Sequence, residues 1–235
     1  MEITEYSIEN TPAPQKINKL GLVREWKSIL QVGNIVLNYK SLVKNKQGNG
    51  QQVVLVPGWL SPATTMFPVK HFLKQIGYAP EYWSYGINNG RVEEYKDKLV
   101  AEWKNHTEPI TMIGWSLGGL IAREVAREIP EVVSSVVTYG TPVKGGPTYT
   151  IGADVYGEEV SSMVADRLVE LDKDNPIRVP LSIIFSKNDN FVSWPACIDE
   201  TSKNAKHYEV KSTHTSLGID PKVWTIIAQH LKEFA

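Results

Sequence analysis

The chain has 235 residues, with 25 lysines and arginines against 26 aspartates and glutamates, so its formal net charge is −1. Apolar residues make up 42% and charged residues 22%, which is ordinary for a globular protein and argues against disorder. A nearly neutral chain gives no general reason to expect nucleic acid or an anionic membrane as a partner. One domain is the default at this length.

Neither a membrane span nor a signal peptide is predicted. No apolar run approaches the ~18 residues needed to cross a bilayer, and the start of the chain, Met1-Glu2-Ile3-Thr4-Glu5, is acidic where a signal peptide is basic. Cys197 is the single cysteine, which excludes an internal disulfide and argues against a Cys-based zinc site. We therefore expect a soluble, cytoplasmic protein without metal or other cofactor. The sequence leaves its oligomeric state open.

The first 50 residues are the least informative. Thr11-Pro12-Ala13-Pro14 predicts an extended entry, because each proline biases the residue before it away from helix. Residues 16–30 carry apolar side chains at roughly helical spacing, and residues 32–42 fit either a strand or a second short helix. We expect residues 1–50 to form a helical and extended segment that packs on a main domain of residues 51–235.

From residue 53 onward, predicted strands and helices alternate. The predicted strands are residues 53–56, 82–85, 109–114, 132–139, 181–185 and 207–210. The predicted helices are residues 68–77, 91–106, 117–128 and a terminal helix with Asp220 as its cap and Pro221 at its first position. Such alternation implies right-handed βαβ units and a mostly parallel sheet flanked by helices, which is an α/β fold.

One segment breaks this alternation. Between Tyr139 and Val179 only residues 158–171 have a helical pattern, and loops of this length are usually functional lids or disordered. We interpret residues 145–180 as a small helical cap, called the cap segment below. Its helix has an apolar stripe that would form part of an apolar mouth: Val160, Met163, Val164, Leu168 and Leu171.

The sharpest local signal is a G-x-S-x-G motif, Gly114-Trp115-Ser116-Leu117-Gly118. It follows a predicted strand and opens a predicted helix, which would place the serine on a tight, strained turn with its hydroxyl exposed. A Cβ atom at Gly114 or Gly118 would press against neighbouring backbone at so sharp a bend. The motif predicts a nucleophilic Ser116, against the alternative of an idle serine in a glycine-rich turn.

A serine nucleophile needs a base, and the base needs a carboxylate. Of the five histidines, only His214 lies in a loop just after the last predicted strand, at the edge where such sheets collect functional groups. Asp189 follows strand 181–185 and would fix the tautomer of the imidazole. Three other aspartates are weaker alternatives: Asp199, Asp172 and Asp174.

The developing oxyanion needs two donors. One should be the backbone N–H of Leu117, directly after the nucleophile. The other should come from the loop after strand 53–56, with Trp59 preferred and Leu60 as the fallback. Two further tryptophans flank these residues. Trp115 and Trp194 are candidates for lining the substrate pocket, although Trp115 could equally brace the turn that carries Ser116.

Taken together, these residues resemble a compact α/β-hydrolase of the bacterial lipase/esterase type. The resemblance covers roughly residues 53–235 and departs from the family pattern at two places. Pro57-Gly58-Trp59 stands where many members have His-Gly, and Asn190 stands where a glycine is common. We expect the second change to be mild, because asparagine tolerates positive φ.

The resemblance implies an α/β-hydrolase fold and a serine hydrolase that cleaves carboxylic esters through an acyl-enzyme on Ser116, His214 and Asp189. An acyltransferase or thioesterase would use the same triad, and a non-catalytic binding protein of this fold is the alternative from another class. The cap segment is short, which favours acyl groups of roughly two to eight carbons.

Overall fold

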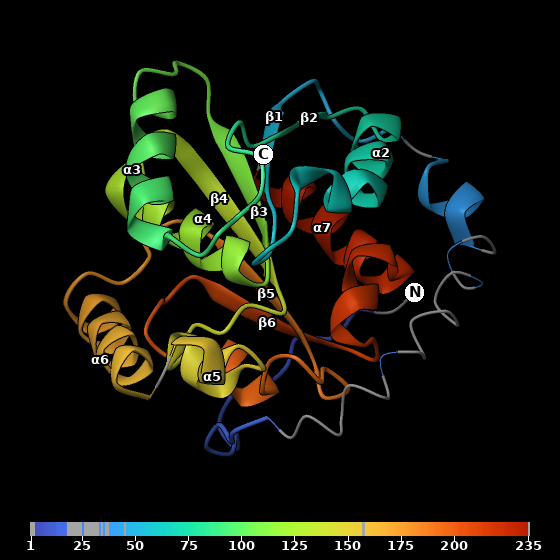
Figure 1. The fold of residues 1–235 in the computed structure, drawn as a ribbon. Helices are drawn as coiled ribbons and strands as arrows, with labels where there is room; N and C mark the ends of the chain where they lie inside the picture. The colour runs from blue at the N-terminus through green and yellow to red at the C-terminus, as the bar shows by residue number, and fades with distance from the viewer. Residues whose placement is uncertain are drawn as a thin grey trace.

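A computed structural model describes residues 3–17, 25, 33, 35, 38–44, 46–156 and 158–234. Its centre is a six-stranded sheet in which every neighbouring pair is parallel, in the order β2-β1-β3-β4-β5-β6 (Figure 1). The strands are β1 (Gln52–Val56), β2 (Ala79–Tyr82), β3 (Ile110–Trp115), β4 (Val133–Tyr139), β5 (Leu181–Ser186) and β6 (Ala205–Val210). The predicted mostly parallel sheet is therefore confirmed.

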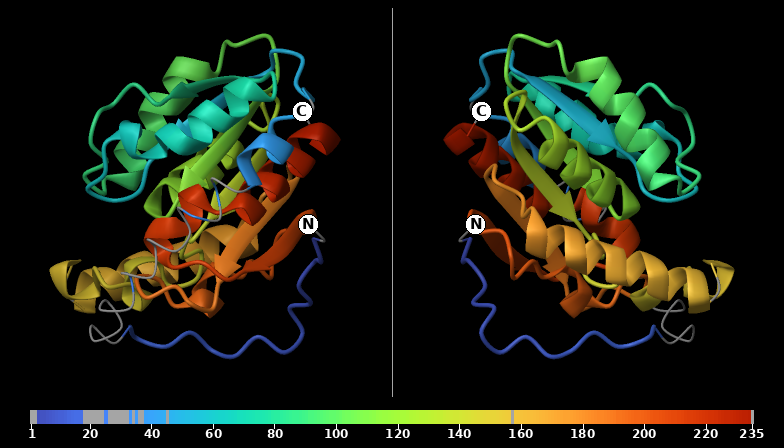
Figure 2. Two further views of the ribbon diagram at one scale, coloured as in Figure 1. Left: turned by 90° about the vertical axis from the view of Figure 1, so that its right-hand side faces the viewer. Right: turned by 90° about the vertical axis from the view of Figure 1, so that its left-hand side faces the viewer.

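Helices cover both faces of the sheet (Figures 1 and 2). The helices are α2 (Phe67–Gln75), α3 (Val92–Trp103), α4 (Leu117–Glu128), α5 (Ala153–Tyr156), α6 (Glu158–Asp174) and α7 (Pro221–Phe234), with short 3₁₀ turns η2 (Ala63–Met66), η3 (Gly146–Tyr149), η4 (Trp194–Cys197) and η5 (His214–Ile219). Helix α7 begins where the sequence predicted, because an Asp220 carboxylate oxygen accepts the N–H of Lys222 at 2.7 Å.

The core lies in two layers because successive strand residues point to opposite faces of the sheet. Val54 and Met112 pack with α3 and α4 on one face, whereas Val53 and Ile113 pack with α2 and α7 on the other. Strands buried on both faces read as continuous apolar runs. That is why the runs at β1, β3, β4 and β5 were visible in the sequence.

The prediction of a strand at residues 82–85 is wrong. Strand β2 begins three residues earlier and pairs with β1 from Ala79 to Tyr82. It contains Pro80, which an edge strand tolerates because the missing N–H costs no hydrogen bond within the sheet. The aromatic residues that follow pack on α3 instead: the Trp83 ring lies 4.6 Å from the Tyr95 ring, and its indole N–H donates to Gly86 O.

The cap segment lies at the edge of the sheet where the strands end, and Figure 2 shows α5 and α6 projecting there. The predicted helix at residues 158–171 is confirmed as α6, which extends to Asp174. The sequence missed η3 and α5, which precede it. On the inner side of α6, Leu168 packs against Leu120 of α4 and Val143, so α4 supports the cap segment.

Part of the N-terminal segment lies beside β6, the edge strand of the sheet. Residues 3–17 run in an extended path along the molecule (Figure 2), as the two prolines predicted. Tyr6 donates its N–H to His207 O at 2.7 Å and packs edge-on against Phe185. Residues 38–42 are helical, and most of the predicted helix at residues 16–30 lies outside the described residues. No described helix is long and apolar enough to cross a bilayer.

Two buried histidines make the fold sensitive to acid. Burial lowers the pKa of His207 to about 4 and the pKa of His230, which also feels the charge of Lys206, to about 3. Both rings accept or share hydrogen bonds inside the protein: His207 Nε2 accepts the Asp199 N–H, and His230 Nδ1 lies 2.8 Å from Ser182 Oγ. The folded state therefore holds these imidazoles neutral.

We predict that stability falls as pH drops below about 6.5, the pKa of an unfolded-state histidine. Between that pH and the lower folded-state pKa, each ring takes up a proton only on unfolding, which costs up to about 1.4 kcal/mol per pH unit. Urea unfolding at pH 7 and pH 5 measures the loss. His230→Asn should flatten this dependence, whereas His71→Asn, at an exposed position, should not. Equal slopes in wild type and His230→Asn would contradict the assignment.

Candidate active site

Ser116 occupies a strained turn between β3 and α4. Its backbone has φ 53° and ψ −126°, a conformation that residues other than glycine rarely adopt. The turn is held on both sides, because the Ser116 N–H donates to Tyr139 O at 2.9 Å and Ser116 O accepts the Thr141 hydroxyl at 2.9 Å. The serine side chain is thereby presented above the end of the sheet.

The glycines of the motif allow α4 to start so close to the strands. A Cβ at Gly114 would lie 2.3 Å from the Cα of Gly119, and one at Gly118 would lie 2.2 Å from the carbonyl oxygen of Val56. Neither approach is possible for a real side chain. The steric role predicted for Gly114 and Gly118 is confirmed.

His214 and Asp189 meet at the same edge of the sheet. Asp189 follows β5, and His214 opens η5 after β6. The Asp189 Oδ2 atom lies 2.6 Å from His214 Nδ1, and both side chains are almost fully buried. The other carboxylate oxygen accepts the backbone N–H groups of Phe191 and Val192, each at 2.8 Å. The carboxylate therefore has a fixed orientation toward the imidazole.

The His214 ring lies over the end of β4, the strand between the one that ends near Ser116 and the one that ends near Asp189. Gly140 follows β4 with φ +62°, and a Cβ there would lie 2.9 Å from His214 Cε1. The ring is also stacked on Phe191, with centroids 5.1 Å apart, and lies 5.7 Å from the Trp115 ring. A side chain at residue 140 would displace the imidazole.

The loop after β1 lies beside the serine. The Leu60 N–H donates to Asn88 O at 2.7 Å, so this N–H is already engaged and does not suit the role of oxyanion donor. Trp59 and Leu117 line the same cavity as Ser116. Of the two donors expected from this loop, Leu60 is therefore the less suitable, and Trp59 stays a prediction.

A cavity of about 960 Å³ opens above the serine. It lies between the loop after β1, the start of α4 and the cap segment. Its lining is mainly apolar and includes Ser116, His214, Trp115, Val164, Leu168 and Leu171. The volume is at the upper end of the range for small-molecule sites. Three residues of the stripe predicted on the cap helix therefore contribute to the cavity.

Trp194 does not line this cavity, contrary to the sequence-based expectation. Its ring is stacked on Phe185 at 5.3 Å and lies edge-on to Tyr6 at 6.0 Å. The reason is η4, which turns the chain back over β5. Cys197 lies in the same turn and is buried, and burial together with the charge of Asp189 raises the pKa of its thiol. The described residues contain no group of three or more His, Cys, Asp or Glu side chains that could hold a metal ion.

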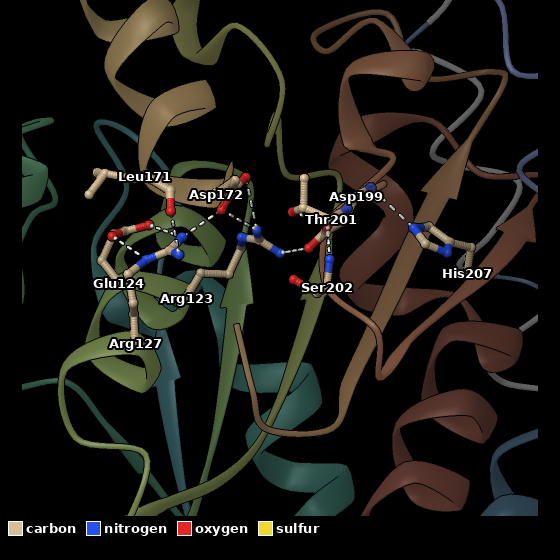
Figure 3. Close-up of polar contacts among 9 residues, drawn as sticks. All are labelled: Arg123, Glu124, Arg127, Leu171, Asp172, Asp199, Thr201, Ser202 and His207. Carbon is tan, nitrogen blue, oxygen red and sulfur yellow. Dashed lines mark hydrogen bonds and ion pairs between the residues drawn. The ribbon is translucent and has the colours of Figure 1, made fainter. Parts of the chain in front are cut away.

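Two of the three alternative acids predicted from the sequence, Asp199 and Asp172, have arginine partners. Asp199 Oδ2 accepts a hydrogen bond from the buried guanidinium of Arg123 at 2.7 Å (Figure 3). Burial alone would raise the pKa of Asp199, but Arg123 and hydrogen bonds from Ser202 lower it well below its ordinary value. Asp172, at the end of α6, accepts from Arg123 at 3.1 Å and from Arg127 at 2.5 Å.

This ionic cluster connects α4 with the cap segment. Figure 3 shows Arg123 between Asp172 and Asp199, with Arg127 between Glu124 and Asp172. Arg127 also donates to Leu171 O at 3.2 Å, which satisfies a carbonyl near the end of α6. The cluster holds the cap in place and leaves the Asp199 carboxylate bound to Arg123 rather than to a histidine side chain.

Sequence reasoning missed two residues at this site. Asn88 is fully buried, and its amide donates to Pro57 O at 2.8 Å, so it holds the loop after β1. The sequence showed only that it lies in a turn-forming run, Asn88-Asn89-Gly90. Glu25 contacts the turn of His214 from a segment more than 180 residues away, and no local pattern could have indicated it.

Comparison with solved structures identifies the fold. The chain resembles a monoacylglycerol lipase from Paleococcus ferrophilus, with a TM-score of 0.59 and 16% identity over 78% of this chain and 95% of that chain. It also resembles a lipase-esterase related protein from Clostridium acetobutylicum, with a TM-score of 0.58 and 18% identity over 82% and 96% of the two chains. A third match is the mouse Alpha/beta hydrolase domain-containing protein 10, with a TM-score of 0.58 and 17% identity over 77% and 88%. The protein has the α/β-hydrolase fold, as the sequence predicted.

Sequence comparison gives shorter matches. The chain is 34% identical over 103 residues to a pimeloyl-[acyl-carrier protein] methyl ester esterase from Photobacterium profundum, which is 39% of this chain and 37% of that protein. The protein of the same name from Shewanella woodyi is 30% identical over 95 residues, 39% of this chain and 36% of that protein. The matches thus span little more than a third of these relatives. No protein-family model matches the chain.

We predict that replacing the two aspartates separates chemistry from stability. Asp189→Asn should reduce ester turnover by roughly 10³–10⁴-fold through the wrong imidazole tautomer, with little change in the unfolding midpoint. Asp199→Asn should leave Arg123 underpaired and destabilise the fold by about 3–5 kcal/mol, while the protein that remains folded keeps its kcat. Urea unfolding and steady-state kinetics measure the two effects. The reverse pattern would assign the acid to Asp199.

Proposed function

We propose that this protein is a serine hydrolase that cleaves carboxylic esters through an acyl-enzyme. One observation carries the proposal: the His214 imidazole is hydrogen-bonded to Asp189 at 2.6 Å and lines the same cavity as Ser116, which stands on a strained turn. The resemblance to enzymes named as esterases and lipases supports the same reaction.

In this mechanism Ser116 Oγ attacks the ester carbonyl and His214 takes its proton. Asp189 accepts a hydrogen bond from the Nδ1–H of His214, which leaves Nε2 to act as the base and stabilises the imidazolium that forms. The backbone N–H groups of Trp59 and Leu117 hold the oxyanion. His214 then returns the proton to the leaving alcohol, and water hydrolyses the acyl-enzyme by the same route.

The substrate we propose is an ester with an apolar acyl group. The cavity lining supports this choice, because Val164, Leu168 and Leu171 of α6 form an apolar wall opposite the serine. The relatives named above carry a methyl ester in their names, and a methyl ester leaves only a small alcohol to place at the mouth of the cavity. Location in the cytoplasm stays a prediction from the sequence.

A thioesterase or acyltransferase would use the same residues. One structural neighbour is titled a thioesterase domain from the curacin biosynthetic pathway, at 13% identity and a TM-score of 0.55. Two substrates with the same acyl group, one an ester and one a thioester, distinguish esterase activity from thioesterase activity. Adding an alcohol acceptor and measuring the acylated product tests transfer.

We predict that Ser116→Ala abolishes both hydrolysis and labelling by a fluorophosphonate probe. Ester turnover should fall by more than roughly 10³-fold because the nucleophile is lost, and the unfolding midpoint should change little. Mass spectrometry of the labelled wild type should place the probe on Ser116. Ser84→Ala, at an exposed position, is the control and should react normally. Wild-type labelling at another serine, or none, would reject the triad and favour a binding protein.

We predict that kcat/KM has an optimum in acyl-chain length and that helix α6 determines it. With a series of acyl esters, kcat/KM should rise up to fourfold per methylene, about 0.8 kcal/mol, as far as roughly eight carbons and then fall. Val164→Trp narrows the cavity and should move the optimum to shorter chains. Val169→Trp is the matched control, because Val169 is exposed on the same helix and does not line the cavity. Rates that climb steadily to sixteen carbons would contradict this limit.

A further inference from the structure

Glu25 is a half-buried carboxylate that lies beside the proposed triad. Its Oε2 atom accepts the Thr215 hydroxyl at 2.7 Å and the Thr215 N–H at 3.2 Å. Its Oε1 atom accepts the amide of Asn190 at 3.2 Å and the His214 N–H at 3.4 Å. One side chain from the N-terminal segment therefore contacts two loops that are distant in sequence.

Those two loops carry the acid and the base. Asn190 directly follows Asp189, and Thr215 directly follows His214. The bond between Asp189 and His214 crosses the same gap between the loops. Glu25 thus forms a second link, parallel to the catalytic one, and fixes the separation of the two side chains without itself touching the imidazole through a hydrogen bond.

This contact also explains Asn190. We expected asparagine to be a mild change from glycine there because it tolerates positive φ, but Asn190 does not have a positive φ, so this tolerance is not used. Its amide instead donates to Glu25 and to Asn188 O at 2.9 Å. A glycine at this position could not make the contact with Glu25.

The carboxylate adds negative charge near the base. Burial alone would raise the pKa of Glu25, but hydrogen bonds from Thr215, Asn190 and Thr213 lower it, so the group is ionised at neutral pH. The ionisable groups that the described residues place around His214 are Asp189, Glu25 and, behind Asp189, the Cys197 thiol. The thiol is neutral, so the two carboxylates supply the local charge.

We propose that Glu25 is a positioning residue of this site, and that the N-terminal segment completes the active-site geometry by linking the loop of Asp189 to the turn of His214. This inference rests on the proposed function only for its kinetic consequence. The link between the loops, and its effect on the imidazole, can be measured without any substrate.

The first experiment records the downfield NMR signal of the proton between His214 Nδ1 and Asp189 Oδ2 in the wild type and in Glu25→Gln. The glutamine keeps the size of the side chain and one acceptor oxygen, but its amide group replaces the second acceptor. Because the two loops then lose part of their link, the Asp189–His214 hydrogen bond should change its geometry and its proton signal should shift or broaden. Glu9→Gln, which removes an exposed carboxylate from the same segment, is the control and should leave the signal unchanged. An unchanged signal in Glu25→Gln would overturn the proposal.

The second experiment measures ester kinetics of the same variants. Glu25→Gln should lower kcat roughly 3–30-fold with a nearly constant KM, since misplacement of the base affects the chemical step more than binding. The acidic limb of the kcat/KM profile should move to lower pH, because a negative charge beside the turn of the base is lost. Glu9→Gln should match the wild type. A variant that loses only thermal stability, with wild-type kcat and pH profile, would show a merely structural role and overturn the proposal.

The two proposals fail in different ways. If the wild type neither hydrolyses esters nor reacts with the fluorophosphonate probe, but the proton signal of the Asp189–His214 bond still changes in Glu25→Gln, the proposed function is wrong and the link between the loops stands. If the wild type is active and neither the proton signal nor kcat changes in Glu25→Gln, the function stands and the positioning role is rejected.

Discussion

The close approach of α4 to the neighbouring strands is the constraint on which the rest of the site depends. The helix begins one residue after Ser116, with its first turn against the carbonyl of Val56 at the end of β1. That approach forces Ser116 into a strained conformation and excludes side chains at Gly114 and Gly118. The strain persists because the sheet and helix around it are fully buried, and it keeps the hydroxyl above the sheet.

The same helix also supports the cap segment. Arg123 and Arg127 lie on α4 and hold the end of α6 through Asp172, while Arg123 reaches Asp199 on the far side (Figure 3). A buried guanidinium is tolerable only with such carboxylate partners. Helix α4 therefore anchors three parts of the site: Ser116, one wall of the cavity of about 960 Å³ and the connection between β5 and β6.

The remaining parts of the site are held by single polar side chains from distant segments. The Asn88 side chain donates to Pro57 O in the loop that carries Trp59, and the Asn88 backbone carbonyl accepts the N–H of Leu60. Glu25 plays the comparable part for the loops of Asp189 and His214. Gly140 contributes because it has no side chain: a Cβ there would lie 2.9 Å from Cε1 of His214. Loops of an α/β sheet are thus positioned by contacts that no secondary-structure pattern encodes.

The sequence by itself determined the order of strands and helices, the parallel sheet and the strand-turn-helix context of Ser116. These follow from local periodicity and from glycine spacing, and the carboxyl ends of parallel strands necessarily bring residues 116, 189 and 214 to one edge. The tertiary structure decided which aspartate faces His214, because Arg123 binds Asp199 across 76 residues of chain. Tertiary contacts also start β2 three residues before the predicted strand, place Trp194 outside the cavity and bring Glu25 to the site. Such choices depend on contacts between residues far apart in the chain, and the hydrophobic pattern of a single segment carries no information about them.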